Sequence, residues 1–234
     1  MTDFEKVKKV AIEFLYIDPV PNEVIPIFAD HPYFENQIYI KKDGSFVDIF
    51  NDSKGLEHIQ RDIERQIMKT TNVYKLLCMI RTPYHLAFLK YTKRAFSKHE
   101  FDKLLAYIWV NSENPNQDAN VGIKTLTEWF KRANKRSLMT LSEYKYYIEL
   151  PAEVNVYRGV AVGRAESKGL SWTCNFETAK WFSERFDNDQ EKGYILKGTI
   201  KKEDIFAYFN GRNEDEICCD SSKITNLTRI NRPA

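Results

Sequence analysis

The pattern of the chain changes at PAEVNVYRGV, residues 151–160. After Pro151, residues 154–160 alternate between apolar and polar side chains, as a half-buried strand does. Upstream of this stretch the apolar residues recur at helical spacing, and downstream several short strand-like segments follow one another. Helices that come first and strands that come later predict an α+β fold.

Downstream of this stretch the sequence predicts further strands and one helix. Residues 170–173 are predicted to form a short extended segment, and residues 177–186 have the spacing of a helix. Residues 193–200 and 216–219 have the pattern of strands. The polar residues 210–213 predict a loop between the last two strands.

Upstream, residues 73–147 have a helical pattern throughout, and a separate set of elements precedes them. That set is a helix over 4–16, hairpin strands over 37–42 and 45–50 around the turn Asp43-Gly44, and an amphipathic helix over 54–70. We therefore predict a helix–hairpin–helix extension over residues 1–70 and the domain proper over residues 71–234.

The composition excludes several classes of protein. The chain has 234 residues, of which 43% are hydrophobic, so a core can form, and its net charge of +2 does not by itself indicate a nucleic acid or membrane partner. No apolar run approaches the ~20 residues of a membrane-spanning helix, and the N-terminus lacks the apolar core of a signal peptide. We therefore expect a cytoplasmic protein with reduced cysteines and, without CxxC or HExxH spacing, no metal site.

The motif Glu214-Asp215-Glu216 is the most specific feature of the sequence. On a strand, side chains two residues apart point to the same side, so the two glutamates are expected to share one face. Carboxylates held so close repel, and at least one should have a raised pKa. Such a pair suits chemistry at a sugar carbon that carries a good leaving group, because a carboxylate stabilises oxocarbenium character. An acidic loop tip beside a strand is the simpler interpretation.

Two further motifs precede the glutamates. In Tyr157-Arg158-Gly159, an arginine at a strand end can bind a phosphate with both arms of its guanidinium, while the glycine lets a ligand approach the main chain. The hydroxyls of Ser171 and Thr173 alternate onto one side of a strand, where one could orient a carboxylate. A surface arginine before a turn and ordinary strand residues are the alternatives.

Aromatic residues lie close to these motifs, among them Trp172, Trp181 and Phe182. Large aromatic side chains bury much apolar area. We therefore expect all three to pack in the core and not to stack on a cofactor.

In order and spacing these motifs resemble those of the arginine–serine–glutamate class of ADP-ribosyltransferases, which includes phage and prophage enzymes. That class has an aromatic-Arg-Gly strand, a serine-containing strand followed by a helix, and a Glu-x-Glu strand near the C-terminus. The resemblance covers residues 73–234 and implies the ADP-ribosyltransferase fold, a helical part followed by a split mixed or antiparallel β core. Trp172 is bulkier than the Thr or Ser usual at its position, and Thr173 stands in place of Ser.

The resemblance implies an NAD-dependent mono-ADP-ribosyltransferase that takes NAD as its substrate and needs no metal. The implied catalytic residues are Glu216, Glu214 and Ser171, and the implied NAD-binding residues are Arg158, Gly159, Ser171 and Thr173. Glu216 would bind the ribose 2′-hydroxyl and stabilise the oxocarbenium ion, with Ser171 orienting it, and Glu214 would position or deprotonate the acceptor. Arg158 would bind the pyrophosphate or nearby ribose, and the main chain of Gly159 the nicotinamide amide.

The resemblance also suggests two loops around the site. Residues 208–213 match the acceptor loop, with Phe209, Asn210 and Arg212 lining the acceptor side. Residues 187–193 are the candidate for the loop near the phosphates and nicotinamide.

The acceptor is expected to be a macromolecule. In this class a first glutamate in Glu-x-Glu is associated with arginine, so protein arginine is the preferred acceptor. Bases of RNA or DNA are an alternative, because Lys124, Lys131, Arg132, Lys135 and Arg136 are locally basic, although a solvated helix face explains them more simply. An NAD glycohydrolase is a further alternative. A toxin or phage effector is implied, for which an antitoxin or other neutralising partner is expected.

Overall fold

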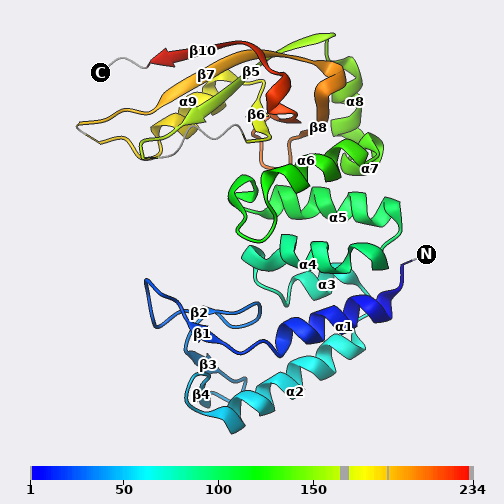
Figure 1. Ribbon diagram of the computed structural model, residues 1–234, viewed down its shortest axis with the longest axis vertical. Coiled ribbons are helices and arrows are strands. Elements are labelled where there is room, and N and C mark those ends of the chain that lie inside the picture. The colour runs from blue at the N-terminus through cyan, green and yellow to red at the C-terminus, as the bar shows by residue number, and fades with distance from the viewer. Residues whose placement is uncertain (1, 164–168, 189, 232–234) are drawn as a thin grey trace. The chain divides into compact units, whose positions relative to one another are not determined.

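The computed structural model describes residues 2–163, 169–188 and 190–231 and divides the chain into two compact units, 1–101 and 102–234 (Figure 1). The division falls inside helix α5 (Lys98–Asn111), later in the chain than the boundary at residues 70 and 71 that the sequence suggested. No helix within the described ranges is both long enough and apolar enough to cross a membrane.

The first unit contains the predicted helix–hairpin–helix order. Its elements are α1 (Phe4–Leu15), β1 (Val20–Pro21), β2 (Ala29–Asp30), β3 (Ile38–Ile40), β4 (Phe46–Asp48), α2 (Ser53–Lys69), α3 (Val73–Leu77), η1 (Thr82–Tyr84), α4 (His85–Thr92) and η2 (Lys93–Ala95). Strands β3 and β4 form the antiparallel hairpin around Gly44, whose φ of 82° suits the turn. The unit extends past residue 70 because Phe14 of α1 packs edge-on against Phe88 and Tyr91, both of α4.

The second unit begins with helices and continues with a sheet, so the predicted α+β class is confirmed. After α5 come η3 (Pro115–Gln117), α6 (Ile123–Arg132), α7 (Lys135–Leu138) and α8 (Leu141–Glu149). The remaining elements are β5 (Glu153–Val160), β6 (Ser171–Thr173), α9 (Phe176–Glu184), β7 (Tyr194–Lys201), η4 (Lys202–Asp204), β8 (Ile205–Phe209), β9 (Glu216–Cys219), η5 (Ser221–Lys223) and β10 (Thr225–Asn231).

Six strands form one sheet in the order β10-β7-β5-β6-β9-β8, and every neighbouring pair is antiparallel within the described residues (Figure 1). Strands β5 and β7 are paired along their whole length, whereas β5 and β6 are joined through Tyr157 and Thr173. The sheet therefore consists of two three-stranded halves with a narrow connection. The edges of β5 and β6 are free to diverge beyond it.

Each half of the sheet has its own helical cover. Helix α9 lies on β5, where its main chain comes so close that only a glycine fits at residue 159. Phe130 of α6 stacks on Phe206 of β8 at 6.0 Å between ring centroids and also contacts Trp109 of α5. These buried aromatic contacts fix the helical part against the half that carries β9.

Candidate functional site

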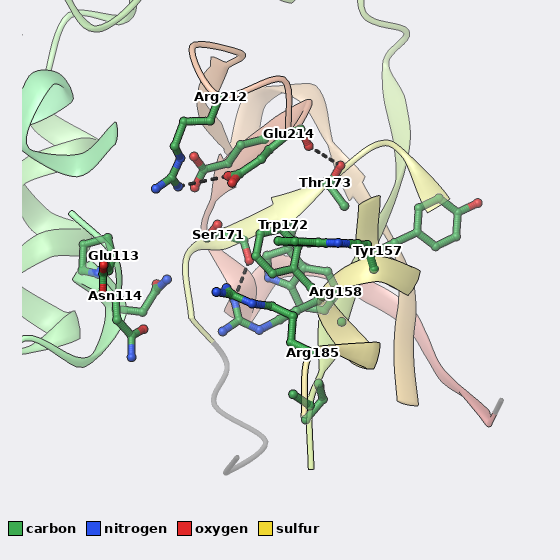
Figure 2. A pocket seen from close by; sticks show the side chains of 18 of the residues that line it. Glu113, Asn114, Tyr157, Arg158, Ser171, Trp172, Thr173, Arg185, Arg212 and Glu214 are labelled. Carbon is green, nitrogen blue, oxygen red and sulfur yellow. Dashed lines mark hydrogen bonds and ion pairs between the residues drawn. The ribbon is translucent and has the colours of Figure 1, made fainter. Parts of the chain in front are cut away.

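A pocket of about 580 Å³ lies in the second unit, at the edges of β5, β6 and β9 (Figure 2). Small-molecule sites typically enclose roughly 300–1,000 Å³. The lining comes from residues 113–117, from β5 and the residue after it, from β6, from the end of α9 and the residues after it, and from the loop before β9.

Three neighbouring strands supply the residues that the sequence singled out. Strand β5 carries Arg158 and Gly159, β6 carries Ser171 and Thr173, and β9 begins with Glu216. These strands are consecutive in the sheet, so residues far apart in sequence become neighbours. All five residues line the same pocket.

The carboxyl group of Glu216 is almost entirely buried, with 4% of the residue exposed. Trp109 of α5 donates a hydrogen bond from Nε1 to Oε1 of Glu216 at 2.9 Å. Burial raises the pKa of Glu216, while the hydroxyl of Ser171, the indole of Trp109 and the charge of Arg212 partly oppose that rise. A raised pKa was predicted from repulsion between the two glutamates, but burial is its main cause and Glu214 contributes less.

Glu214 reaches the pocket by a different route from the predicted one. The prediction that Glu214 and Glu216 alternate along one strand is wrong, because β9 begins at Glu216 and Asp215 has a left-handed φ of 47°. Asn213 is left-handed as well, with φ 57°. The kinked main chain lets Glu214 and Glu216 both line the pocket, whereas Asp215 is not part of the lining.

Four residues hold Asp215 in this conformation. Its carboxylate accepts hydrogen bonds from the hydroxyl of Tyr208 at 2.6 Å and from Nδ2 of Asn175 at 3.2 Å. Its N–H donates to Oδ1 of Asn210 at 3.1 Å, and its carbonyl accepts from the N–H of Cys174 at 3.2 Å. Hydrogen bonds on both sides of the residue offset the cost of a left-handed aspartate.

Arg158 and Gly159 are placed by the sheet and by α9. The guanidinium of Arg158 donates to the main-chain carbonyl of Ser171, which joins β5 to β6 across the pocket (Figure 2). Burial lowers the pKa of Arg158, and the nearby carboxylate of Glu216 opposes that shift. A Cβ atom on Gly159 would lie 2.2 Å from the carbonyl oxygen of Ala179, so the glycine is required for helix packing.

The hydroxyl of Thr173 is used by the protein itself. It donates to the main-chain carbonyl of Glu214 at 2.8 Å and accepts from the N–H of Asn175 at 3.0 Å. Thr173 also stands opposite Glu216 in the β6–β9 register. The residue lines the pocket, and its hydroxyl fixes the chain that carries Glu214.

The predicted acceptor loop is shorter than expected. Phe209 is buried in β8, and Asn210 uses its side chain to bind the N–H of Asp215 and its own N–H to bind Glu143. Of the three residues predicted on the acceptor side, all of them described by the structure, Arg212 lines the pocket and the other two do not. The reason is that the strand continues to residue 209 before the chain turns.

The loop predicted over residues 187–193 does not line this pocket where it is described. Asp187 accepts from the N–H of Gly193 at 3.0 Å, and Asn188 accepts from the N–H groups of Gln190 and Glu191. Residue 189 lies outside the described residues. Glu191 and Gly193 instead line a second hollow of about 320 Å³.

Two parts of the pocket lining were not predicted. Residues 113–117 form one wall, and Asn116 fixes it by accepting from the N–H of Leu170 at 2.7 Å. At the end of α9, Trp181 is 56% exposed and lines the pocket, contrary to the prediction that it packs in the core, whereas Trp172 is buried. Arg185 lies over the ring of Trp181 at 5.1 Å.

Three of the basic residues of α6 and α7 are engaged by neighbouring groups. Lys131 pairs with Asp220 at 2.9 Å, and Arg132 lies 3.6 Å from Glu128 on its own helix. Lys135 donates to the hydroxyl of Tyr147 at 2.7 Å. This pairing favours the simpler interpretation of the basic stretch as a helix surface.

Among the described residues there is no group of three or more His, Cys, Asp or Glu side chains that could hold a metal ion. Comparison with known proteins finds no family model that matches the chain, no similar curated protein and no similar solved structure.

Proposed function

We propose that the chain cleaves NAD and transfers ADP-ribose to a macromolecular acceptor, with protein arginine preferred. The observation that carries the proposal is the convergence of Arg158, Ser171 and Glu216, from three adjacent strands, on one pocket that can hold a small molecule. A cationic group, a hydroxyl and a buried carboxylate are what an anionic dinucleotide with a cationic leaving group requires.

In the proposed reaction the bond between the nicotinamide nitrogen and the ribose breaks, and its electron pair leaves with nicotinamide. Positive charge develops on the sugar, and the buried carboxylate of Glu216 stabilises it more strongly than an exposed carboxylate would, because water does not screen it. Arg158 binds the pyrophosphate, and Ser171 orients Glu216. An acceptor nitrogen attacks the opposite face of the sugar and loses its proton to Glu214.

Release of nicotinamide from NAD tests the proposal. Glu216→Gln keeps the size of the side chain but removes its charge, so the rate should fall by about two to three orders of magnitude, as losing an electrostatic contact of ~3–4 kcal/mol does. Glu153→Gln, at an exposed position of β5 outside the pocket lining, is the matched control and should leave the rate unchanged. Equal rates in wild type and Glu216→Gln would refute the assignment.

Labelled NAD with a cell lysate, separated afterwards into protein and RNA fractions, distinguishes the acceptors. Label on protein supports the preferred acceptor, and label on RNA supports the alternative. Free ADP-ribose alone indicates a glycohydrolase, and unchanged NAD indicates a binding module. Glu214→Gln should reduce transfer more than hydrolysis, because Glu214 acts on the acceptor.

A role as toxin or phage effector follows from the family resemblance alone.

A further inference from the structure

Arg212 crosses the pocket beside the two glutamates. Its Nη2 lies 3.0 Å from Oε2 of Glu214 (Figure 2). Its Nη1 donates to the main-chain carbonyl of Ser112 at 3.3 Å. Ser112 immediately precedes the wall formed by residues 113–117. The guanidinium thus bridges the loop before β9 and the opposite wall of the pocket.

The carboxylate of Glu214 therefore already holds a guanidinium in the free protein. Both partners remain partly accessible, with 39% of the Arg212 side chain and 24% of the Glu214 side chain exposed. Ion pairs this exposed contribute little, so a second guanidinium can exchange with the first at small cost. Exchange keeps the same charge and the same planar, forked donors on Glu214.

We infer that Arg212 occupies the acceptor position on Glu214 and competes there with the guanidinium of an incoming arginine. This inference rests on the proposed function and narrows its acceptor to guanidino groups. Arg212 must move away from Oε2 of Glu214 before an acceptor nitrogen can give its proton to that oxygen. Arg212 is accordingly a specificity-determining residue that lowers the use of weakly bound acceptors.

Competition between methylguanidine and water for the ADP-ribosyl group tests the inference. Arg212→Gln should lower the methylguanidine concentration needed for half-maximal transfer several-fold, because the competing cation is gone. Arg212→Lys, which keeps a cation without the fork, should lower it less. For methylamine, a cation without the guanidino fork, the concentration needed for half-maximal transfer should change little in Arg212→Gln. Arg132→Gln removes a comparable Arg–Glu pair outside the pocket and should leave the concentration unchanged.

A binding measurement separates this inference from the proposed function. Ligand-observed NMR should detect binding of methylguanidine to the Arg212→Gln variant. This binding should disappear in the double variant that also carries Glu214→Gln. If NAD is cleaved but Arg212→Gln uses methylguanidine no better than wild type, the competition is refuted. If NAD is not cleaved, the proposed function fails, and binding that depends on Glu214 still supports a guanidinium site. If NAD is not cleaved and methylguanidine binding is also unaffected by Glu214→Gln, the guanidinium site on Glu214 is refuted together with the proposed function.

Discussion

Glu216 is a carboxylic acid with almost no access to water, held by donors from two different elements. The indole of Trp109 approaches it from α5, and the hydroxyl of Ser171 from the neighbouring strand β6. Both favour the charged form, burial favours the neutral form, and burial is the stronger influence. Arg212 and Glu214 add opposing charges from the loop before β9. The pH at which Glu216 ionises therefore depends on groups from α5, from β6 and from the loop before β9.

Trp109→Phe should change the pH dependence of nicotinamide release. In the proposed reaction the charged carboxylate is the active form, so the rate should rise with pH through the pKa of Glu216, which lies above the usual value near 4.5. Removing the indole N–H disfavours the charged form and therefore moves this rise to higher pH.

A pH–rate profile of kcat/KM measures the effect, with Trp129→Phe as the control. Trp129 is also buried, but it lies in α6 outside the pocket lining. The phenyl ring at residue 109 retains most of the packing, so a lower rate without a displaced profile would assign Trp109 to structure alone.

The conformation of Asp215 was beyond what the sequence could predict. Glu-x-Glu suggests strand alternation because alternation is the default for residues two apart. The real arrangement depends on Tyr208, Asn175 and Asn210, whose side chains meet Asp215 only in the folded chain. A local signal exists in retrospect, since asparagine and aspartate are the non-glycine residues that most readily adopt left-handed φ, and Asn213 and Asp215 both do.

At the scale of elements, helix α9 is positioned by one glycine of β5. A Cβ atom on Gly159 would lie 2.2 Å from the carbonyl oxygen of Ala179 and 2.6 Å from the nitrogen of Ser183, both main-chain atoms of the helix. The end of the same helix presents Trp181 and Arg185 to the pocket. The position of the helix on the sheet therefore sets one side of the site.

Gly159→Ala should force α9 away from β5. Overpacking of this kind costs typically 1–3 kcal/mol, and we expect a loss of that size together with weaker NAD binding. Chemical denaturation and the KM for NAD measure the two effects. Gly122→Ala, where a Cβ would meet nothing within 4 Å, should change stability by less than ~1 kcal/mol. Unchanged stability in Gly159→Ala would show that the helix adjusts freely.

Strands with a clear alternation were predictable, whereas two strands without one, β8 and β10, were not predicted. Strand β5 alternates in sequence and in burial, and it was predicted. Strand β8, Ile205–Phe209, consists of five buried apolar residues with no alternation, and β10, Thr225–Asn231, is a mostly exposed edge strand with polar residues. The wall at residues 113–117 was not predicted, because its place at the pocket depends on Asn116 accepting a hydrogen bond from the main chain of Leu170.

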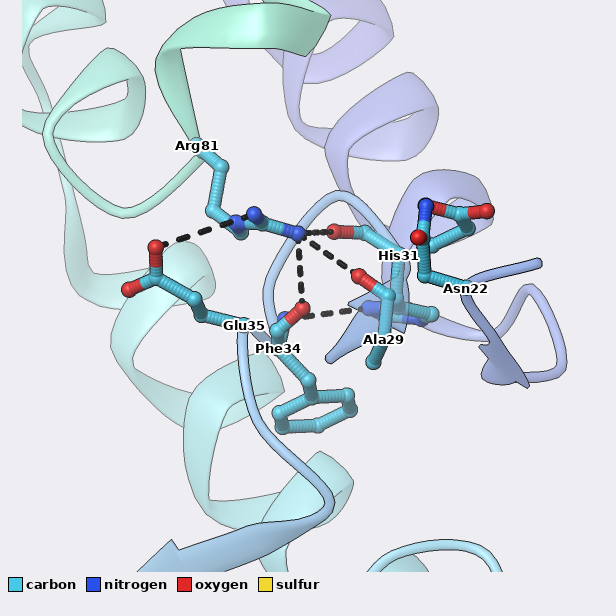
Figure 3. A network of polar contacts seen from close by, with 7 residues as sticks. Asn22, Ala29, His31, Phe34, Glu35 and Arg81 are labelled. Atoms are coloured by element: carbon cyan, nitrogen blue, oxygen red, sulfur yellow. Dashed lines mark hydrogen bonds and ion pairs between the residues drawn. The ribbon is translucent and has the colours of Figure 1, made fainter. Parts of the chain in front are cut away.

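At the scale of the whole molecule, the described pocket lining comes entirely from residues 102–234, and residues 1–101 form a unit with its own internal bonds. Arg81 is central to that unit (Figure 3). Its Nη1 donates to the carbonyls of Ala29 at 2.9 Å, His31 at 3.2 Å and Phe34 at 3.0 Å, and its Nη2 lies 3.8 Å from Glu35. One guanidinium thus fixes the segment between the two small β-ribbons, which explains why the unit continues beyond the second helix.

The buried charge of Glu216 should make the wild-type protein less stable at neutral pH than a variant without it. The folded pKa is raised above the unfolded one, so the folded state binds more protons in the interval between them, and the free energy of unfolding falls as pH rises through that interval. Each unit of the displacement is worth about 1.4 kcal/mol once both states are ionised. Glu216→Gln retains an oxygen that can accept from Trp109 but carries no charge.

We therefore expect Glu216→Gln to raise the free energy of unfolding at pH 7, by ~1.4 kcal/mol for each unit of that displacement. For a chain of this size each kcal/mol raises Tm by about 2–4 °C. The difference should shrink as pH falls toward 4, where the wild-type carboxyl is neutral in the folded state and mostly neutral in the unfolded state. Denaturation of both proteins at pH 4 and pH 7 measures it, with Glu153→Gln as the exposed control. A variant less stable than wild type at pH 7 would mean that Arg158 and Arg212 compensate the charge fully. Increased stability with lost activity would show that the fold keeps this carboxylate for chemistry at a cost in stability.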